Sequence, residues 1–159
     1  MGVGKSSVAR HLASILRCER IDLDAFIETS TGRSIADIIN ADGESEYRTI
    51  ETENLSRALK ETQARILSLG GGTWTVPANR DLIAEHSLVT VWLESTFEHC
   101  WTNISKSRKE RPLAKNKNAA KKLFDERQRV YCLADWHFIV RPEFTSYDIA
   151  RQIAEQVFS

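Results

Sequence analysis

The chain has 159 residues, of which 42% are hydrophobic and 28% charged, and its 22 basic side chains balance its 22 acidic ones. This length fits a single domain, 1–159, with one sizeable core, and the charge balance argues against general attraction to nucleic acid or an anionic membrane. No apolar run approaches the length of a membrane span and no signal peptide is recognisable, so a cytoplasmic protein is expected.

Hydrophobic periodicity predicts strands and helices that alternate along the chain. Helices are predicted from Ser6 onward and over residues 34–40, 44–60, 77–85, 96–104, 123–134 and 145–158. Strands are predicted over residues 20–24, 66–69, 88–93 and 136–140, and the basic segment 105–122 predicts a mobile loop. Such alternation indicates parallel β-α-β units in a three-layer α/β fold, where ligands bind beyond the carboxyl ends of the strands.

The first candidate site is the run Gly2-Val3-Gly4-Lys5-Ser6-Ser7. Glycines let backbone N–H groups turn toward phosphate oxygens, and the N-terminus of the following helix adds partial positive charge. In the full phosphate-loop pattern the lysine reaches the β- and γ-phosphates and the serine binds Mg²⁺. The leading glycine of that pattern would lie two residues before Met1. The alternative is an unstructured tail that carries the Gly-Lys-Ser tripeptide by chance.

Two acids, Asp22 and Asp24, stand at the end of the first predicted strand. One can support Mg²⁺ through water, while the other accepts a hydrogen bond or a proton from a substrate hydroxyl. Taken alone, they also fit solvated loop acids.

Three consecutive glycines, residues 70–72, follow the second predicted strand. They indicate either a plain turn or a surface where a flat substrate lies directly on backbone. Arg48 and Arg127 are candidates for binding a substrate carboxylate, or else solvated helix arginines. Arg111, in the basic loop, could bring a cation onto a transferring phosphoryl group, or could belong to a solvated charge run.

Together these motifs resemble the shikimate kinase family over essentially the whole chain. The resemblance rests on their order: Gly-x-Gly-Lys-Ser, then Asp-x-Asp, Thr31-Gly32-Arg33, Asp42-Gly43-Glu44 with Tyr47-Arg48, the triple glycine, Arg111-Pro112-Leu113 and Arg127.

The resemblance implies a kinase that phosphorylates the 3-hydroxyl of shikimate with MgATP, in the route to aromatic amino acids. It implies the following roles: ATP binding by Gly2, Val3, Gly4, Lys5, Ser6, Ser7, Arg111 and Arg141, Mg²⁺ binding by Ser6 and Asp22, shikimate binding by Asp24, Arg48, Gly71 and Arg127, and catalysis by Lys5, Asp24 and Arg111. It also implies a monomer whose partners are ATP and shikimate, with a lid over about residues 105–122.

The family fold is that of P-loop kinases related to nucleoside-monophosphate kinases, with five parallel strands in the order 2-3-1-4-5. The first and central of these strands is missing from this chain. We therefore expect a gap about two strand spacings wide, roughly 10 Å, with unpaired backbone on both sides. Met1 is then predicted to be an internal methionine of the phosphate loop.

Three further departures from the family pattern affect the candidate site. The lid is about three residues shorter than in many relatives, Ala114 replaces a common leucine, and Asn103 stands near where an arginine often faces adenine. Despite these departures, the resemblance predicts that the chain is a shikimate kinase. The alternatives are a catalytically silent homologue and a related small-molecule kinase such as a gluconate kinase.

Overall fold

The computed structural model describes residues 2–107 and 111–158. The helices are α1 (Lys5–Leu16), α2 (Leu23–Thr31), α3 (Ile35–Asp42), α4 (Glu44–Glu61), α5 (Pro77–Glu85), α6 (Phe97–Lys106), α7 (Lys117–Tyr131) and α8 (Ser146–Val157). The strands are β1 (Arg20–Asp22), β2 (Ile66–Ser68), β3 (Val91–Glu94) and β4 (Trp136–Ile139), and two 3₁₀ turns are η1 (Thr73–Thr75) and η2 (Pro112–Ala114).

Local capping explains where several helices begin. The side chains of Ser34 and Asn116 accept hydrogen bonds from backbone N–H groups in the first turns of α3 and α7. In α8, Thr145 and Asp148 form a reciprocal capping box. Pro77 occupies the first turn of α5, where its missing N–H is not needed.

The strands form two separate parallel pairs. β1 pairs with β2 and β3 pairs with β4, and within the described residues no ladder joins the two pairs. These pairs correspond to strands 2-3 and 4-5 of the expected order. The α/β fold and the gap at the position of the central strand are therefore both confirmed.

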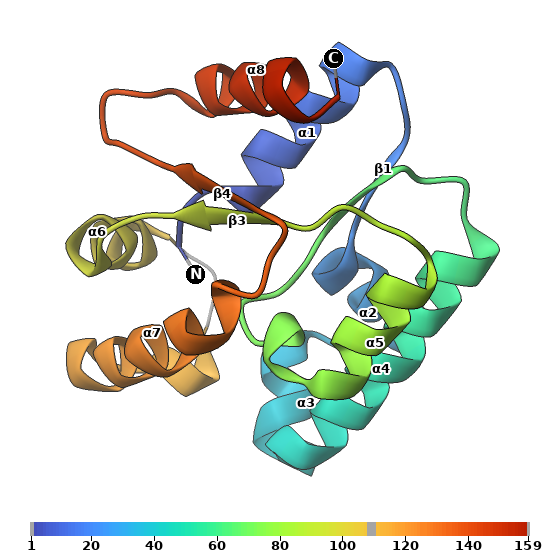
Figure 1. Cartoon of the computed structure of the whole chain (residues 1–159). Coiled ribbons are helices and arrows are strands. Elements are labelled where there is room, and N and C mark those ends of the chain that lie inside the picture. Colours follow the sequence, from blue (N-terminus) through green and yellow to red (C-terminus); the bar gives the residue numbers. More distant parts are fainter. Residues whose placement is uncertain (1, 108–110, 159) are drawn as a thin grey trace.

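Helices cover both faces of the divided sheet (Figure 1). On one face α1 packs against α8, and the hydrophobic cluster between them includes Val8, Leu12, Phe138 and Ile153. On the other face α2, α3, α4 and α5 enclose a second cluster. A third and smaller cluster lies between α6 and α7, below β3 in the view of Figure 1.

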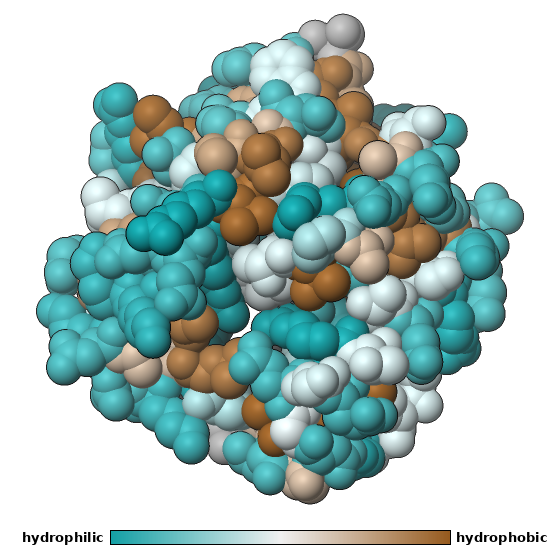
Figure 2. Space-filling model, turned by 60° about the horizontal axis from the view of Figure 1, so that its bottom comes forward, coloured by the Kyte–Doolittle hydropathy of each residue, from teal (hydrophilic) through white to brown (hydrophobic). Residues whose placement is uncertain are grey.

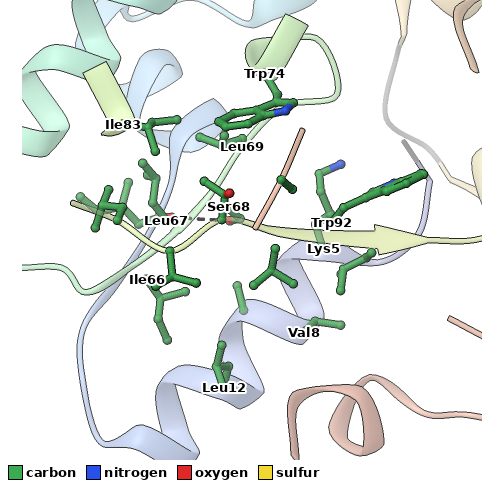
Figure 3. Close-up of a pocket in the computed structure, with 18 of the residues that line it drawn as sticks. Lys5, Val8, Leu12, Ile66, Leu67, Ser68, Leu69, Trp74, Ile83 and Trp92 are labelled. Atoms are coloured by element: carbon green, nitrogen blue, oxygen red, sulfur yellow. Dashed lines mark hydrogen bonds between the residues drawn. The ribbon is translucent and has the colours of Figure 1, made fainter. Parts of the chain in front are cut away.

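A large apolar cavity, which we call the central groove, occupies the gap between β2 and β3. It has a volume of about 370 Å³. Figure 3 shows Ile66, Leu67 and Leu69 on one wall, Trp92 on the other, and Val8 and Leu12 of α1 along its floor. Because both flanking strands lack a partner on this side in the part of the chain that the structure describes, the groove exposes backbone N–H and C=O groups as well as apolar side chains.

Several sequence-based boundaries were wrong. The predicted strand 20–24 ends at Asp22, and helix α2 begins at Leu23 because the Asp22 carboxylate caps it. The predicted strand 88–93 is shorter and lies later, at Val91–Glu94. The segment 105–122 was predicted as loop, but it contains η2 and the first turns of α7, and residues 108–110 lie outside the described part.

No helix in the described part of the chain combines the length and hydrophobicity that crossing a membrane requires.

Candidate functional site

The phosphate-loop residues form the entrance to α1. Gly4 is the N-cap residue of this helix and has φ 85°, a left-handed conformation that favours glycine. Gly2 also has a positive φ, and a Cβ atom there would lie 2.6 Å from the carbonyl oxygen of Cys100. Asn103 on α6 donates from Nδ2 to the Gly2 carbonyl at 2.7 Å. Helix α6 thus supports the loop from behind, while the N-terminus of α1 remains directed at the cavity in front.

Ser6 and Asp22 form a hydrogen-bonded pair beside this loop. The Ser6 hydroxyl donates to Asp22 Oδ2 at 2.7 Å, and Asp22 Oδ1 accepts from the Ala25 N–H at 3.2 Å. The two oxygen atoms are of the kind that Mg²⁺ prefers. Among the described residues no group of three or more His, Cys, Asp or Glu side chains could hold a metal. The pair therefore fits a metal that takes its remaining ligands from nucleotide and water.

Asp24 lies two residues after Asp22, in the first turn of α2. Its Oδ1 lies 2.9 Å from the place where a Cβ atom of residue 70 would stand, so only glycine fits there without displacing the carboxylate. The first glycine of the triple run therefore gives Asp24 its place in the cavity.

The other two glycines of the run accommodate two arginines. A Cβ atom at residue 72 would lie 2.2 Å from Arg48 Nη2, and one at residue 71 would lie 2.6 Å from Arg127 Nη1. The guanidinium groups of Arg48 on α4 and Arg127 on α7 thus lie directly against the backbone of this loop. Two cations on neighbouring glycines suit a planar carboxylate.

Arg48 is held by acidic partners. Its Nη1 lies 2.8 Å from Oε1 of the buried Glu51, and its Nη2 lies 3.6 Å from Oε1 of the exposed Glu44. Burial tends to lower the pKa of Arg48, but the charge of Glu51 and the hydrogen bond to it outweigh this and raise the pKa above its usual value. The guanidinium is a permanent charge at this position.

Arg111 precedes η2 and points into the same cavity. Its Nη1 is buried and makes no hydrogen bond within the described part of the chain. Burial lowers the pKa of Arg111 below its usual value, and the negative charge of Asp24 only partly opposes this shift. A buried cationic donor without a partner is costly unless an anion binds there.

These side chains surround one cavity of about 290 Å³, which we call the polar cavity. Of the predicted site residues, it is lined by Gly2, Gly4, Lys5, Ser6, Ser7, Asp22, Asp24, Arg48, Gly71, Arg111 and Arg127. Figure 2 shows a mainly hydrophilic face of the molecule that is hollowed near its centre.

Two predicted site residues lie elsewhere. Val3 is buried and faces the central groove, and Arg141 is exposed in the connection between β4 and α8, away from both cavities. The larger central groove is mostly apolar, so we assign the functional site to the smaller polar cavity, where the charged groups converge.

Sequence reasoning missed the residues behind the two arginines. Glu51 contacts Arg48, and the Tyr131 hydroxyl donates to the Gly71 carbonyl beside Arg127. Trp74 also joins η1 to α7, through Nε1 and the Val130 carbonyl at 3.0 Å. Spacing carried a signal for two of them, since Glu51 follows Arg48 by three residues and Tyr131 follows Arg127 by four, which places each pair on one helix face.

Comparison with known proteins gives a consistent result. The family model for shikimate kinase matches residues 1–158. The shikimate kinase of Streptococcus thermophilus is 39% identical over 134 residues, covering 82% of this chain and 80% of that protein. That of Brucella canis is 33% identical over 146 residues, covering 90% and 72%.

A solved structure gives the same relationship in three dimensions. Shikimate kinase from Acinetobacter baumannii in complex with shikimate superposes with a TM-score of 0.88 and 30% identity, covering 98% of this chain and 87% of that one. A second, from Aquifex aeolicus, has a TM-score of 0.77 and 25% identity, covering 98% and 89%. With a family model that spans nearly the whole sequence and relatives above 30% identity, the chain belongs to the shikimate kinase family.

Proposed function

We propose that this protein transfers the γ-phosphoryl group of ATP to the 3-hydroxyl of shikimate, in the route to aromatic amino acids. The observation that carries the proposal is the content of the polar cavity. A phosphate loop, an acid and two glycine-backed arginines line the same space of about 290 Å³. The related structure from A. baumannii, which contains shikimate, supports the choice of substrate.

ATP would bind with its phosphates on the N–H groups of Gly2 to Ser7 and on Lys5. Ser6 and Asp22 would hold Mg²⁺, the serine directly and the acid through water, consistent with their 2.7 Å hydrogen bond. When bound, Mg²⁺ neutralises phosphate charge. Arg141 stays a candidate for the adenine end of ATP.

Shikimate would bind at the other end of the cavity. Arg48 and Arg127 pair with its carboxylate, and the backbone of Gly71 supports its ring. Asp24, between this end and the phosphate loop, holds the ring hydroxyls and orients the one that attacks. A carboxylate at one end and a reacting hydroxyl at the other give the ring a single orientation.

Arg111 supplies charge from the lid side. Phosphoryl transfer proceeds through a loose transition state that needs alignment and charge neutralisation more than covalent help. The buried Nη1 of Arg111, without a partner in the described residues, fits a donor that acquires its acceptor when ATP binds.

We further propose that the protein acts as a monomer in the cytoplasm.

An ADP-release assay on the purified protein tests this function, with shikimate, with gluconate and without acceptor. We expect ADP release to depend on shikimate and on Mg²⁺, and phosphorus NMR to detect a phosphate monoester of shikimate. Turnover of gluconate alone would favour the related sugar-acid kinase, and turnover of neither would favour a silent homologue.

A further inference from the structure

A buried polar network lies behind Arg48, centred on Glu51. Glu51 lies on helix α4, and its side chain is fully buried, with 0% exposure. Three groups donate to its carboxylate: Arg48 Nη1 to Oε1 at 2.8 Å, Tyr47 Oη to Oε2 at 3.0 Å and Thr73 Oγ1 to Oε2 at 2.7 Å. A buried carboxylate with several donors is satisfied, whereas one that loses a donor is strained.

Thr73 connects this network to the glycine loop and to α5. It follows the triple glycine directly and is itself fully buried. Its carbonyl accepts from Asn79 Nδ2 at 3.0 Å, and Asn79 Oδ1 accepts from the Thr52 hydroxyl at 2.7 Å. The position of the Thr73 hydroxyl is thus fixed by the core and does not depend on solvent.

Tyr47 supplies the second hydroxyl. Burial, followed by the negative charge of Glu51, raises the pKa of Tyr47 above its usual value, so the phenol keeps its proton and donates. The Arg48 guanidinium also lies over the Tyr47 ring, with Cζ 5.1 Å from the ring centroid.

The two hydroxyls occupy Oε2, which leaves Oε1 facing Arg48. They therefore set the rotation of the carboxylate, and the carboxylate sets the plane of the guanidinium. Arginine recognises a carboxylate best when its fork is correctly oriented, and a small rotation changes one of two parallel hydrogen bonds.

From this geometry we infer that Thr73 and Tyr47 are positioning residues for Arg48, and that through Glu51 they set the preference of the site for a carboxylated acceptor. Thr73 does not line the polar cavity, and Tyr47 lines it but donates its hydroxyl to Glu51. Their effect should appear in acceptor affinity, in KM rather than in kcat. The inference rests on the proposed function, because it assigns the Arg48 guanidinium to the acceptor carboxylate.

The test compares shikimate with its methyl ester, which has the same ring and hydroxyls but no negative charge. Thr73→Val removes the hydroxyl with little change in volume, and Thr73→Ser keeps a donor. We expect Thr73→Val to raise KM for shikimate about tenfold, with kcat and KM for ATP within about twofold of wild type. The rise should shrink to about twofold with the ester, and Thr73→Ser should restore most of the affinity.

Tyr47→Phe gives an independent route to the same result, since it keeps the ring under Arg48 and removes only the hydroxyl. Thr62→Val is the matched control. Thr62, the C-cap residue of α4, donates from Oγ1 to the Ala58 carbonyl at 2.7 Å, at the opposite end of the helix from Tyr47 and Arg48. This variant should lower Tm and leave the ratio of KM values for shikimate and ester unchanged.

The outcomes distinguish a failure of the inference about Thr73 and Tyr47 from a failure of the proposed function. If wild-type protein phosphorylates shikimate but Thr73→Val and Tyr47→Phe leave the shikimate-to-ester ratio at its wild-type value, the network is structural only and the inference is wrong. If wild-type protein neither binds nor phosphorylates shikimate, the proposed function fails and the inference fails with it.

Discussion

The two cavities of this molecule lie side by side, yet they are built in opposite ways. The polar cavity is lined by side chains from several helices and loops, and one of its arginines, Arg48, is held by the buried Glu51. The central groove is lined by apolar side chains and by strand edges that lack a partner among the described residues. The groups that would perform chemistry are therefore held by local contacts, while the sheet has a gap between β2 and β3.

Because the two cavities are built differently, the geometry of the site and the stability of the scaffold can be tested separately. Changes in the polar cavity should alter kcat or KM and spare the free energy of unfolding. Substitutions of groove side chains other than Lys5, which lines both cavities, should change the free energy of unfolding and spare kcat and KM.

The largest effect is expected from Asp24→Asn in the polar cavity. Loss of the group that orients the attacking hydroxyl should lower kcat by about 10²- to 10⁴-fold, while ATP affinity stays close to wild type. Steady-state kinetics and calorimetric titration of ATP measure the two quantities. Asp81→Asn, at an exposed position on α5, is the control and should behave as wild type. A loss of ATP affinity in Asp24→Asn would contradict the assigned role.

The groove should respond to an added strand. Val3 and Lys5 line it, so a segment fused ahead of Met1 can enter it. Five apolar β-branched residues followed by glycine and one more residue should pair with β2 and β3 and raise Tm by about 5 °C or more. Hydrogen exchange should show new protection at amides of Ile66–Ser68 and Val91–Glu94.

A control extension of the same length with proline at alternate positions lacks the N–H groups that a ladder needs, so it should leave Tm and exchange unchanged. Equal protection by both extensions would indicate nonspecific coverage of the groove and would break the comparison with the polar cavity.

An intermediate effect is expected from Gly72→Ala. Its backbone conformation is ordinary for any residue, with φ −100°, but the new Cβ would lie 2.2 Å from Arg48 Nη2. The displaced arginine should raise KM for shikimate about tenfold, corresponding to about 1.4 kcal/mol. The matched control is Gly32→Ala, which meets no atom within 4 Å but has φ 68°. That variant should lose about 1 kcal/mol of stability and keep its KM; a KM change in it would contradict the separation.

The smallest effect concerns the capping box of α8, because Thr145 and Asp148 line neither the polar cavity nor the central groove. Hydrogen bonds from the backbone and side chain of Thr145 hold the pKa of Asp148 below its usual value. A depressed pKa stabilises the fold at pH values above the unfolded pKa, and the contribution disappears as pH falls through the folded pKa. Asp148→Asn should therefore lower Tm slightly at neutral pH and converge with wild type in acid. A difference that grew on acidification would show that another group is responsible.

Much of the site could be predicted from the sequence because its motifs are local. Gly4 directly precedes α1, Asp22 ends β1 and the triple glycine follows β2. The carboxyl ends of parallel strands meet at one edge of a sheet. The strand order and the missing central strand followed from the family resemblance, and the observed pairing agrees with both.

What could not be predicted depends on contacts distant in sequence. Glu51 reads as one more acid on a polar helix, and only the Thr73 hydroxyl, 22 residues away, reveals a buried carboxylate. Helix α2 was missed because Asp22 ends a strand and caps a helix at once. The start of α7 was missed because its lysine-rich first turns show little apolar periodicity, although Asn116 caps it.

Lys5 belongs to the lining of both cavities, and Figure 3 shows it at the end of the groove beside Trp92. This shared wall has a thermodynamic consequence. A segment that fills the groove and fixes the lysine changes the free energy of phosphate binding. Because such coupling is reciprocal, bound nucleotide must change the affinity of that segment for the groove by the same factor. The affinity for nucleotide therefore reports whether the groove is filled, without a direct measurement on the sheet.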